Sequence, residues 1–400
     1  MRKSWLPAIT AAIVCAGLTG GAAAESWQDT VAAARGGTVY WNAWGGDERT
    51  NTFIAWVAAE MAERYGVTVR HVKLSDTAEA VARVIAEKTA GRDHGGSVDL
   101  IWINGPNLLS MKENNLLFGP FAEDLPNYRY VDTVNKPSNV VDFTLPVDGM
   151  ASPWRLAQIV FVYDSARVSD VPRSIPDFLH WAKAHPGRFA HPDVRDFLGV
   201  TFLKQALYEL APDPDILQSP ATDANFDAVT APLWAWYDEL KPLLWRQGRQ
   251  FPQNGPAARQ LLADGEIDML ISFDPAEAAA WVNAGLAPDT VRAFTLDKGT
   301  IGNTSFVAIP YNSANTDAAM VLANFLLEPS VQARAQDTRH LGSFTVLAVD
   351  TLDTDQRWLF EELPSNPALP GNDDLRLALP EPHPSWMTRI ADEWMRRYVN

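Results

Sequence analysis

One stretch of the sequence reads as strand, glycine-rich turn, helix and strand in direct succession: residues 36–74, GGTVYWNAWGGDERTNTFIAWVAAEMAERYGVTVRHVKL. Residues 38–41 are β-branched or aromatic, and residues 42–46 are turn-forming. Thr50 can cap the following helix, and Gly66 can end it. Two strands joined in this way are parallel, and the right-handed crossover places the turn at the carboxyl edge of their sheet. Because open α/β sheets bind ligands at that edge, this turn is the first predicted binding surface.

The alternation of helix and strand continues after this unit. Residues 76–90 have helical periodicity, and residues 98–103, VDLIWI, form a continuous apolar run typical of a buried parallel strand. The turn Asn104-Gly105-Pro106 then falls at the same predicted edge. Asp99 begins this strand, so we predict a structural role for it, whereas the turn lies at the functional end. The pattern predicts an α/β fold.

The first 24 residues are predicted to be a signal peptide. Arg2 and Lys3 precede an apolar core that is shorter than the ~20 residues a membrane-spanning helix needs, and small residues then offer a cleavage site. Cys15, the single cysteine of the chain, lies inside this segment. The mature chain is therefore expected to be exported to the periplasm as a soluble protein without disulfides.

Charge and composition argue against some partners. The formal net charge is −16, with 33 Lys and Arg against 49 Asp and Glu. Nucleic acids and anionic lipids are bound through basic surfaces, so the acidic balance argues against both. The carboxylates and the 15 tryptophans suit a flat or cationic ligand, but a solubilising surface and core packing explain them as well.

Motifs for catalysis are missing from the sequence. It has no G-x-S-x-G elbow, no H-E-x-x-H and no G-x-x-x-x-G-K-[ST] loop. His180 and His185 are five residues apart, which is poor spacing for a metal pair on a helix. We predict a binding protein with no catalytic residues, no cofactor and no metal. An exported hydrolase is the alternative from a different class.

Five segments carry a family resemblance: VDLIWINGPNLLSMKENNLLFGPF (98–121), GMASPWRLAQIVFVYD (149–164), VPRSIPDFLHWAKAHPGRFAHP (171–192), GEIDMLISFDPAEAAAWVNAGL (265–286) and GTIGNTSFVAIPYNSANTDAAMVLANFLLEPSVQARAQ (299–336). In this order they resemble family 1 extracellular solute-binding proteins, the periplasmic receptors of ABC importers. The resemblance is greatest to the YnjB-type branch, for which thiamine uptake has been suggested.

The resemblance implies a two-lobed periplasmic binding protein fold of type II, with a ligand cleft between lobes joined by crossing hinge segments. The first lobe is expected to comprise residues 25–153 and 301–335, and the second residues 154–300 and 336–400. Such a receptor is expected to act as a monomer, to bind a small-molecule ligand and to deliver it to the permease of an inner-membrane ABC transporter.

Candidate ligand-binding residues lie where strands end at the cleft or where the chain crosses it. Tryptophan offers a flat face to a ring or cation, amides pair with polar groups, and a carboxylate neutralises an ammonium. The candidates are Asn42, Trp44 and Asn104 on the first lobe, Trp154, Arg155 and Gln158 on the crossing strand, Phe273 and Asp274 on the second lobe, and Asn303 and Thr304 on the return crossing.

Several of these candidates have a structural alternative. Trp44 and Trp154 can be packing residues, and Asp274 can be the N-cap of a helix that begins at residue 275. The pair Asn303-Thr304 can shape a hinge turn. Arg155 can pair with a lobe carboxylate instead of a ligand.

The ligand itself is predicted to be small and polar. Thiamine or a similar aromatic cation is our first prediction, and a polyamine, a sugar and a metal chelate are the alternatives. Ferric iron is less favoured because the sequence shows no cluster of Tyr and His ligands.

Overall fold

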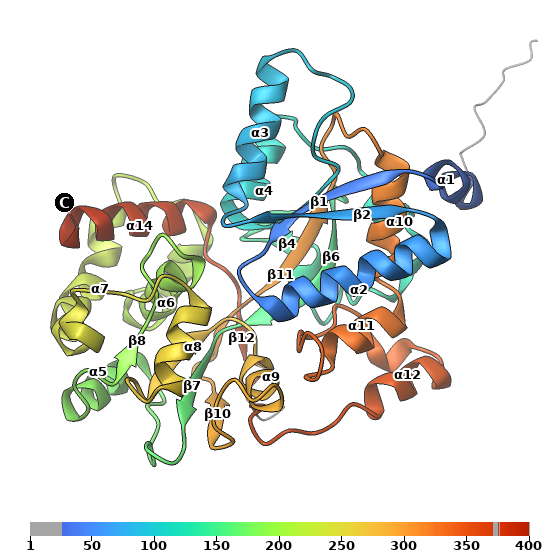
Figure 1. Cartoon of the computed structure of the whole chain (residues 1–400). Coiled ribbons are helices and arrows are strands. Elements are labelled where there is room, and N and C mark those ends of the chain that lie inside the picture. Colours follow the sequence, from blue (N-terminus) through green and yellow to red (C-terminus); the bar gives the residue numbers. More distant parts are fainter. Residues whose placement is uncertain (1–25, 371–374, 376, 400) are drawn as a thin grey trace, which may run out of the picture.

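The computed structural model describes residues 26–370, 375 and 377–399 as two α/β lobes that share long crossing strands (Figure 1). The predicted signal peptide over residues 1–24, with Cys15, lies outside the described residues. Within the described part of the chain, no helix is both long and apolar enough to cross a membrane.

The first lobe is built on a sheet in the order β12-β11-β3-β1-β2, with β6 paired to β11. Its strands are β1 (Thr38–Trp44), β2 (Thr68–Leu74), β3 (Leu100–Ile103), β6 (Ala151–Gln158), β11 (Thr300–Ala308) and β12 (Ala378–Leu379). Strand β1 is parallel to β2 and β3, as predicted, while β11 is antiparallel to β3 and β6. The helices of this lobe are α1 (Trp27–Ala34), α2 (Glu48–Tyr65), α3 (Ala78–Thr89), α4 (Gly105–Glu113), α10 (Thr316–Leu326), α11 (Pro329–Gln336) and α12 (Thr354–Glu361).

The opening unit confirms the predicted strand-helix-strand order and corrects two details. Gly66 ends α2 in the left-handed region, at φ 67°, as predicted. The N-cap is Asp47, whose carboxylate accepts a hydrogen bond from the backbone N of Thr50 at 3.0 Å, so Thr50 is not the cap. Strand β1 continues through Asn42 to Trp44 because those residues pair with β2, so Asn42 lies inside a strand and not in the turn.

The second lobe has a sheet in the order β10-β7-β9-β8. Its strands are β7 (Val160–Asp164), β8 (Phe189–Ala190), β9 (Met269–Ser272) and β10 (Val291–Phe294). Its helices are α5 (Ile175–Ala184), α6 (Phe197–Leu210), α7 (Phe226–Leu240), α8 (Gly255–Ala263), α9 (Glu277–Asn283) and α14 (Pro384–Tyr398). Trp386, Ile390 and Trp394 form the buried face of α14, as their spacing predicts. Helix α14 packs on α6 and also contacts α4 of the first lobe (Figure 1).

Two adjacent strands carry the chain between the lobes. Strand β6 continues into β7 at Ile159, whose backbone N donates to the carbonyl of Ile301 on β11 at 2.8 Å. Ile159 and Ile301 belong to the second-lobe core, whereas Trp154 and Val307 of the same two strands belong to the first-lobe core. Both crossings therefore lie side by side, as a hinge requires.

The predicted lobe boundaries stay predictions, and the packing suggests a different position for the last one. Leu341, Val346 and Leu347 are buried in the first-lobe core, and Phe360 of α12 packs against it. The second-lobe core resumes with the partly buried Leu379 of β12 and with α14. We therefore propose that the third crossing follows α12 and does not occur at residue 336.

Candidate ligand site between the lobes

Two sheet edges meet between the lobes. In the first lobe α2, α3 and α4 begin where the parallel strands β1, β2 and β3 end. In the second lobe α6 and α9 begin after β8 and β9, which are also parallel. Side chains from these strand ends and helix starts bond across the boundary, so this is the surface on which the two lobes close.

The contact that joins the two lobes at this surface most directly is the ion pair Arg155–Asp274. Nη2 of Arg155 on β6 lies 2.7 Å from Oδ2 of Asp274, which follows β9. The same oxygen accepts a hydrogen bond from Ser343 Oγ at 2.9 Å, and Oδ1 accepts one from the backbone N of Ala276 at 3.2 Å. Burial raises the pKa of Asp274 and lowers the pKa of Arg155, and each charge opposes the shift of the other.

Arg155 also lies against two indole rings. Its guanidinium carbon is 5.2 Å from the ring centre of Trp102 and 5.6 Å from that of Trp154. The two rings are perpendicular to each other, at 4.9 Å between centres and 85°. A cation held by two aromatic rings and a carboxylate is therefore present at the lobe boundary, and here the protein itself supplies that cation.

A second ion pair crosses the boundary beside the first. Nη2 of Arg49, in the first turn of α2, lies 3.2 Å from Oε1 of Glu277, the first residue of α9. Arg49 also donates to the carbonyl of Leu341 at 3.1 Å, and Ser272 Oγ bonds the Glu277 carboxylate. Burial raises the pKa of Glu277 to about 7, while the charge of Arg49 opposes that shift. The start of α9 is thus held to the first lobe through Glu277, and the turn before it through Asp274.

A third ion pair is buried beside the hinge strands. Lys204 of α6 and Glu381 are 2.6 Å apart, with 0% and 1% of their side chains exposed. Asn303 on β11 donates to Glu381 at 2.9 Å, and the ammonium of Lys204 lies 4.7 Å from the ring centre of Phe143 in the first lobe. Burial lowers the pKa of Lys204 and raises that of Glu381, and each opposes the other. The pair therefore connects α6, through Lys204, with the segment after β12, through Glu381, and Asn303 ties it to the hinge strand β11.

An aspartate accepts a hydrogen bond at the start of each of five helices on this surface. Asp47 accepts from Thr50 N on α2, Asp76 from Ala78 N on α3, Asp142 from Gly105 N on α4, Asp196 from Leu198 N on α6 and Asp274 from Ala276 N just before α9. Helix N-termini carry partial positive charge and commonly bind anions. Here the protein's own carboxylates occupy those positions. Burial, with a smaller contribution from Asp76 on the facing lobe, raises the pKa of Asp196 to about 6, and burial raises the pKa of Asp142 well above its ordinary value.

Partly exposed aromatic side chains lie among these carboxylates. They are Trp44 and Trp102 on the first lobe and Phe197 and Phe273 on the second. Phe197 and Phe273 meet edge to face, with ring centres 5.0 Å apart and an interplanar angle of 71°. The surface therefore combines flat apolar faces with negative charge.

Several candidate residues from the sequence meet at the hinge. Arg155 and Asp274 pair with each other, which matches the alternative of an ion pair with a lobe carboxylate. Gln158 donates to Thr300 Oγ1 at 3.1 Å, so it joins β6 to β11. Asn303 bonds Glu381, and its Oδ1 has no hydrogen-bond partner among the described residues.

Other candidates are held within one lobe. Asn42 is fully buried and accepts a hydrogen bond from Arg83 at 3.2 Å. Thr304 bonds Ser138 and Asn139. Trp154 is 1% exposed and belongs to the first-lobe core, which matches its packing alternative. Asn104 occupies the N-cap position of α4 but makes no capping bond, because Asp142 bonds the start of that helix.

The prediction that Asp274 is the N-cap of a helix beginning at residue 275 is wrong. Helix α9 begins at Glu277 with Ala276 at the N-cap, two residues beyond Asp274. The Asp274 carboxylate stabilises the turn before the helix through the backbone N of Ala276 and also holds Arg155.

Residues that the sequence did not single out complete this surface. Trp102 lies in the strand VDLIWI, close to its predicted functional end, so its position was a usable signal. Phe197 follows the N-cap Asp196 and Arg49 follows the N-cap Asp47, which is a weaker signal. Lys204 stands out as a charge inside an apolar helix, but nothing local indicates its partner.

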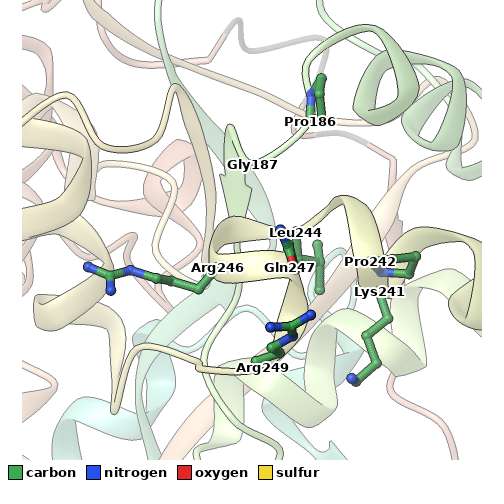
Figure 2. Close-up of a pocket in the computed structure, with 8 residues that line it drawn as sticks. All are labelled: Pro186, Gly187, Lys241, Pro242, Leu244, Arg246, Gln247 and Arg249. Carbon is green, nitrogen blue, oxygen red and sulfur yellow. The ribbon is translucent and has the colours of Figure 1, made fainter.

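A cavity of about 600 Å³ lies elsewhere, on the second lobe (Figure 2). It is lined by Pro186, Gly187, Lys241, Pro242, Leu244, Arg246, Gln247 and Arg249. All of these residues come from the loop before β8 and from the segment after α7, so a molecule bound there would touch one lobe alone. Binding in this cavity therefore cannot drive closure of the two lobes. Among the described residues, no group of three or more His, Cys, Asp or Glu side chains is placed to hold a metal ion.

Comparison with known proteins agrees with this architecture. The sequence profile of the family described as bacterial extracellular solute-binding protein matches residues 56–360. The chain belongs to this family. It is 41% identical over 375 residues to Protein YnjB of Escherichia coli (strain K12), with 94% of each chain covered. This solute-binding protein is therefore a periplasmic receptor that serves an ABC transporter, and its family consists of transport proteins, not enzymes.

Solved structures confirm the two-lobed fold. The Tp0655 (TpPotD) lipoprotein of Treponema pallidum is 14% identical, with 90% of this chain and 99% of that chain covered and a TM-score of 0.65. The periplasmic binding protein AfuA of Actinobacillus pleuropneumoniae, with fructose-6-phosphate bound, is 14% identical, with 90% and 98% covered and a TM-score of 0.61. At this level of identity the likeness concerns the fold alone.

Proposed function

We propose that this solute-binding protein captures a small aromatic cation of the thiamine type between its lobes and delivers it to the permease of its ABC transporter. The observation that carries the proposal is the set of aspartates at the starts of the five helices that meet at the lobe boundary. With those starts occupied by carboxylates, an anionic ligand would meet negative charge instead of free backbone N–H groups.

The basic side chains at the boundary support the same choice. Arg49 is paired with Glu277, Arg155 with Asp274 and Lys204 with Glu381. An anion would have to break one of these pairs to gain Arg49, Arg155 or Lys204 as a positive partner. A cation that displaces Arg155 from Asp274 restores the charge pairing of that carboxylate, and it meets further carboxylates on both lobes.

The aromatic side chains favour a flat ligand over a sugar. Trp44 and Trp102 on one lobe and Phe197 and Phe273 on the other are partly exposed at the strand ends. Cations and aromatic rings are both stabilised against such faces, and the attraction grows when water is excluded. A thiazolium or pyrimidinium ring combines both features in one ligand.

Closure follows from contact with both lobes at once. A ligand shifts a two-state equilibrium only by its difference in affinity for the two states. Carboxylates and aromatic faces of one lobe alone would bind the open form equally well. Because the proposed site draws Asp274 and Phe273 from the second lobe and Trp102 from the first, bound ligand stabilises the closed form, as in hinge-bending binding proteins generally.

Replacing Asp274 with asparagine tests this site. We expect Asp274→Asn to weaken thiamine binding by about 1.5–3 kcal/mol, the usual value of a hydrogen bond to a charged group, as measured by isothermal titration calorimetry. Spermidine and fructose-6-phosphate, titrated in parallel, separate a polyamine or an anion from an aromatic cation.

Asp268 provides the matched control. It precedes β9 as Asp274 follows it, it is equally buried, and it pairs with Arg188 on the side away from the first lobe. Asp268→Asn is expected to lower stability without changing affinity. If both variants bind thiamine like the wild type, or if the wild type binds fructose-6-phosphate instead, the proposed function is wrong.

A further inference from the structure

We propose that the Arg155 guanidinium is a built-in substitute for the ligand cation: it occupies the cation subsite when no ligand is bound and must leave when ligand binds. The inference rests on the proposed function, because it takes the ligand to be a cation. Arg155 would then set the apparent affinity for the ligand cation and exclude cations that bind too weakly to displace it.

The geometry of Arg155 is that of a bound cation. Its guanidinium lies over Trp102 and Trp154 at 5.2 and 5.6 Å from their ring centres and 2.7 Å from the Asp274 carboxylate. Aromatic faces with an opposing carboxylate are what a thiazolium or guanidinium ligand would need. Since Asp274 lies on the other lobe, this internal contact also draws the lobes together.

The hydrogen bonding of Arg155 is incomplete, which suits a group that can be displaced. Its Nε is buried and has no hydrogen-bond partner among the described residues. The neighbouring Trp154 Nε1 is likewise buried without a partner there. A buried donor without an acceptor costs free energy, so this position of the Arg155 side chain is stabilised less than a fully bonded one.

Lys204, a second buried cation at the boundary, is held more firmly than Arg155. Lys204 is fully buried, bonds Glu381 at 2.6 Å, and its partner is held in turn by Asn303. Among the carboxylates of the described residues, Asp274 is the one that pairs with Arg155, and Asp274 has two further donors, Ser343 and Ala276, that can retain it. Loss of Arg155 from the subsite therefore leaves Asp274 positioned for another cation.

The consequence is a measurable loss of apparent affinity. When a binding-competent state is only partly populated, the apparent Kd rises by the inverse of that fraction. If Arg155 occupies the subsite about nine-tenths of the time, removing it should tighten binding of a ligand cation about tenfold. A residue that contacts the ligand directly would have the opposite effect when removed.

The experiment combines Arg155→Ala with two probes, methylguanidinium and thiamine, both titrated by calorimetry. Arg155→Ala should bind methylguanidinium at millimolar concentration, because the variant leaves free the position that the Arg155 guanidinium occupies in the wild type. The wild type should not bind methylguanidinium. The same variant should bind thiamine about tenfold more tightly than the wild type, by the population argument above. Arg173→Met is the control, because Arg173 lies over Phe294 within the second lobe and bonds the Thr295 carbonyl. It should behave like the wild type.

The outcomes separate this inference from the proposed function. Binding of methylguanidinium by the variant, with no thiamine binding by either protein, would keep the subsite and refute the thiamine-type ligand. No methylguanidinium binding, or weaker thiamine binding by the variant, would overturn the inference. Should Arg155→Ala fail to fold, Arg155→Met replaces it. In the wild type, arginine side-chain NMR should also show the Arg155 guanidinium become mobile on addition of thiamine, and an unchanged signal would contradict displacement.

Discussion

Truncating Trp154 to alanine is expected to lower the free energy of unfolding of the ligand-free protein by about 3–5 kcal/mol, the range for large core aromatics. Trp154 is 1% exposed and contacts three other aromatic rings, those of Trp41, Phe53 and Trp102. Removing the indole leaves a cavity that these rings can fill only in part. Denaturant melts of the ligand-free protein measure the effect.

Trp358 serves as the control for that substitution. It lies on α12 and is 57% exposed, so Trp358→Ala should change stability by no more than about 0.5 kcal/mol. A Trp154→Ala variant that unfolds like the wild type would contradict the role of Trp154 in the first-lobe core.

Replacing Lys204 with methionine is expected to destabilise the protein by about 3–5 kcal/mol, the usual cost of leaving one partner of a buried ion pair alone. Glu381 is 3% exposed and burial raises its pKa, and in the variant Asn303 would be the one side-chain donor left to its carboxylate among the described residues. Adding Glu381→Gln should restore much of the loss, since the amide oxygen still accepts from Asn303 and no charge is buried.

An exposed pair in the same lobe provides the reference. Lys183 and Glu239 are 2.8 Å apart, but 51% and 60% of their side chains are exposed. Because water screens such a pair, Lys183→Met should cost less than about 1 kcal/mol. Equal losses for Lys204→Met and Lys183→Met would mean that burial does not control the strength of the hinge pair.

Local pattern carries much of the fold. Helix α3, Ala78–Thr89, lies within the helical pattern of residues 76–90, and Gly66 ends α2 as its position indicates. These features depend on neighbouring residues, so a single sequence contains them. The family resemblance added the order of the lobes and the crossing strands, which local pattern alone does not contain.

The errors arise where a distant partner decides the structure. Strand β1 runs on to Trp44 because β2 supplies hydrogen-bonding partners for Asn42 and Ala43, although those residues read as a turn. Arg155 and Asp274 are 119 residues apart, and Lys204 and Glu381 are 177 apart. Each pair depends on how the lobes pack, and that information is not local to either residue.

The central claim is that a small aromatic cation is held between the lobes, and its most direct test is mass spectrometry of the molecule released from protein freshly isolated from the periplasm. We expect one cationic compound with an aromatic ring per chain, with the mass of thiamine or a derivative. A sugar phosphate, a neutral sugar or iron recovered in that stoichiometry would contradict it.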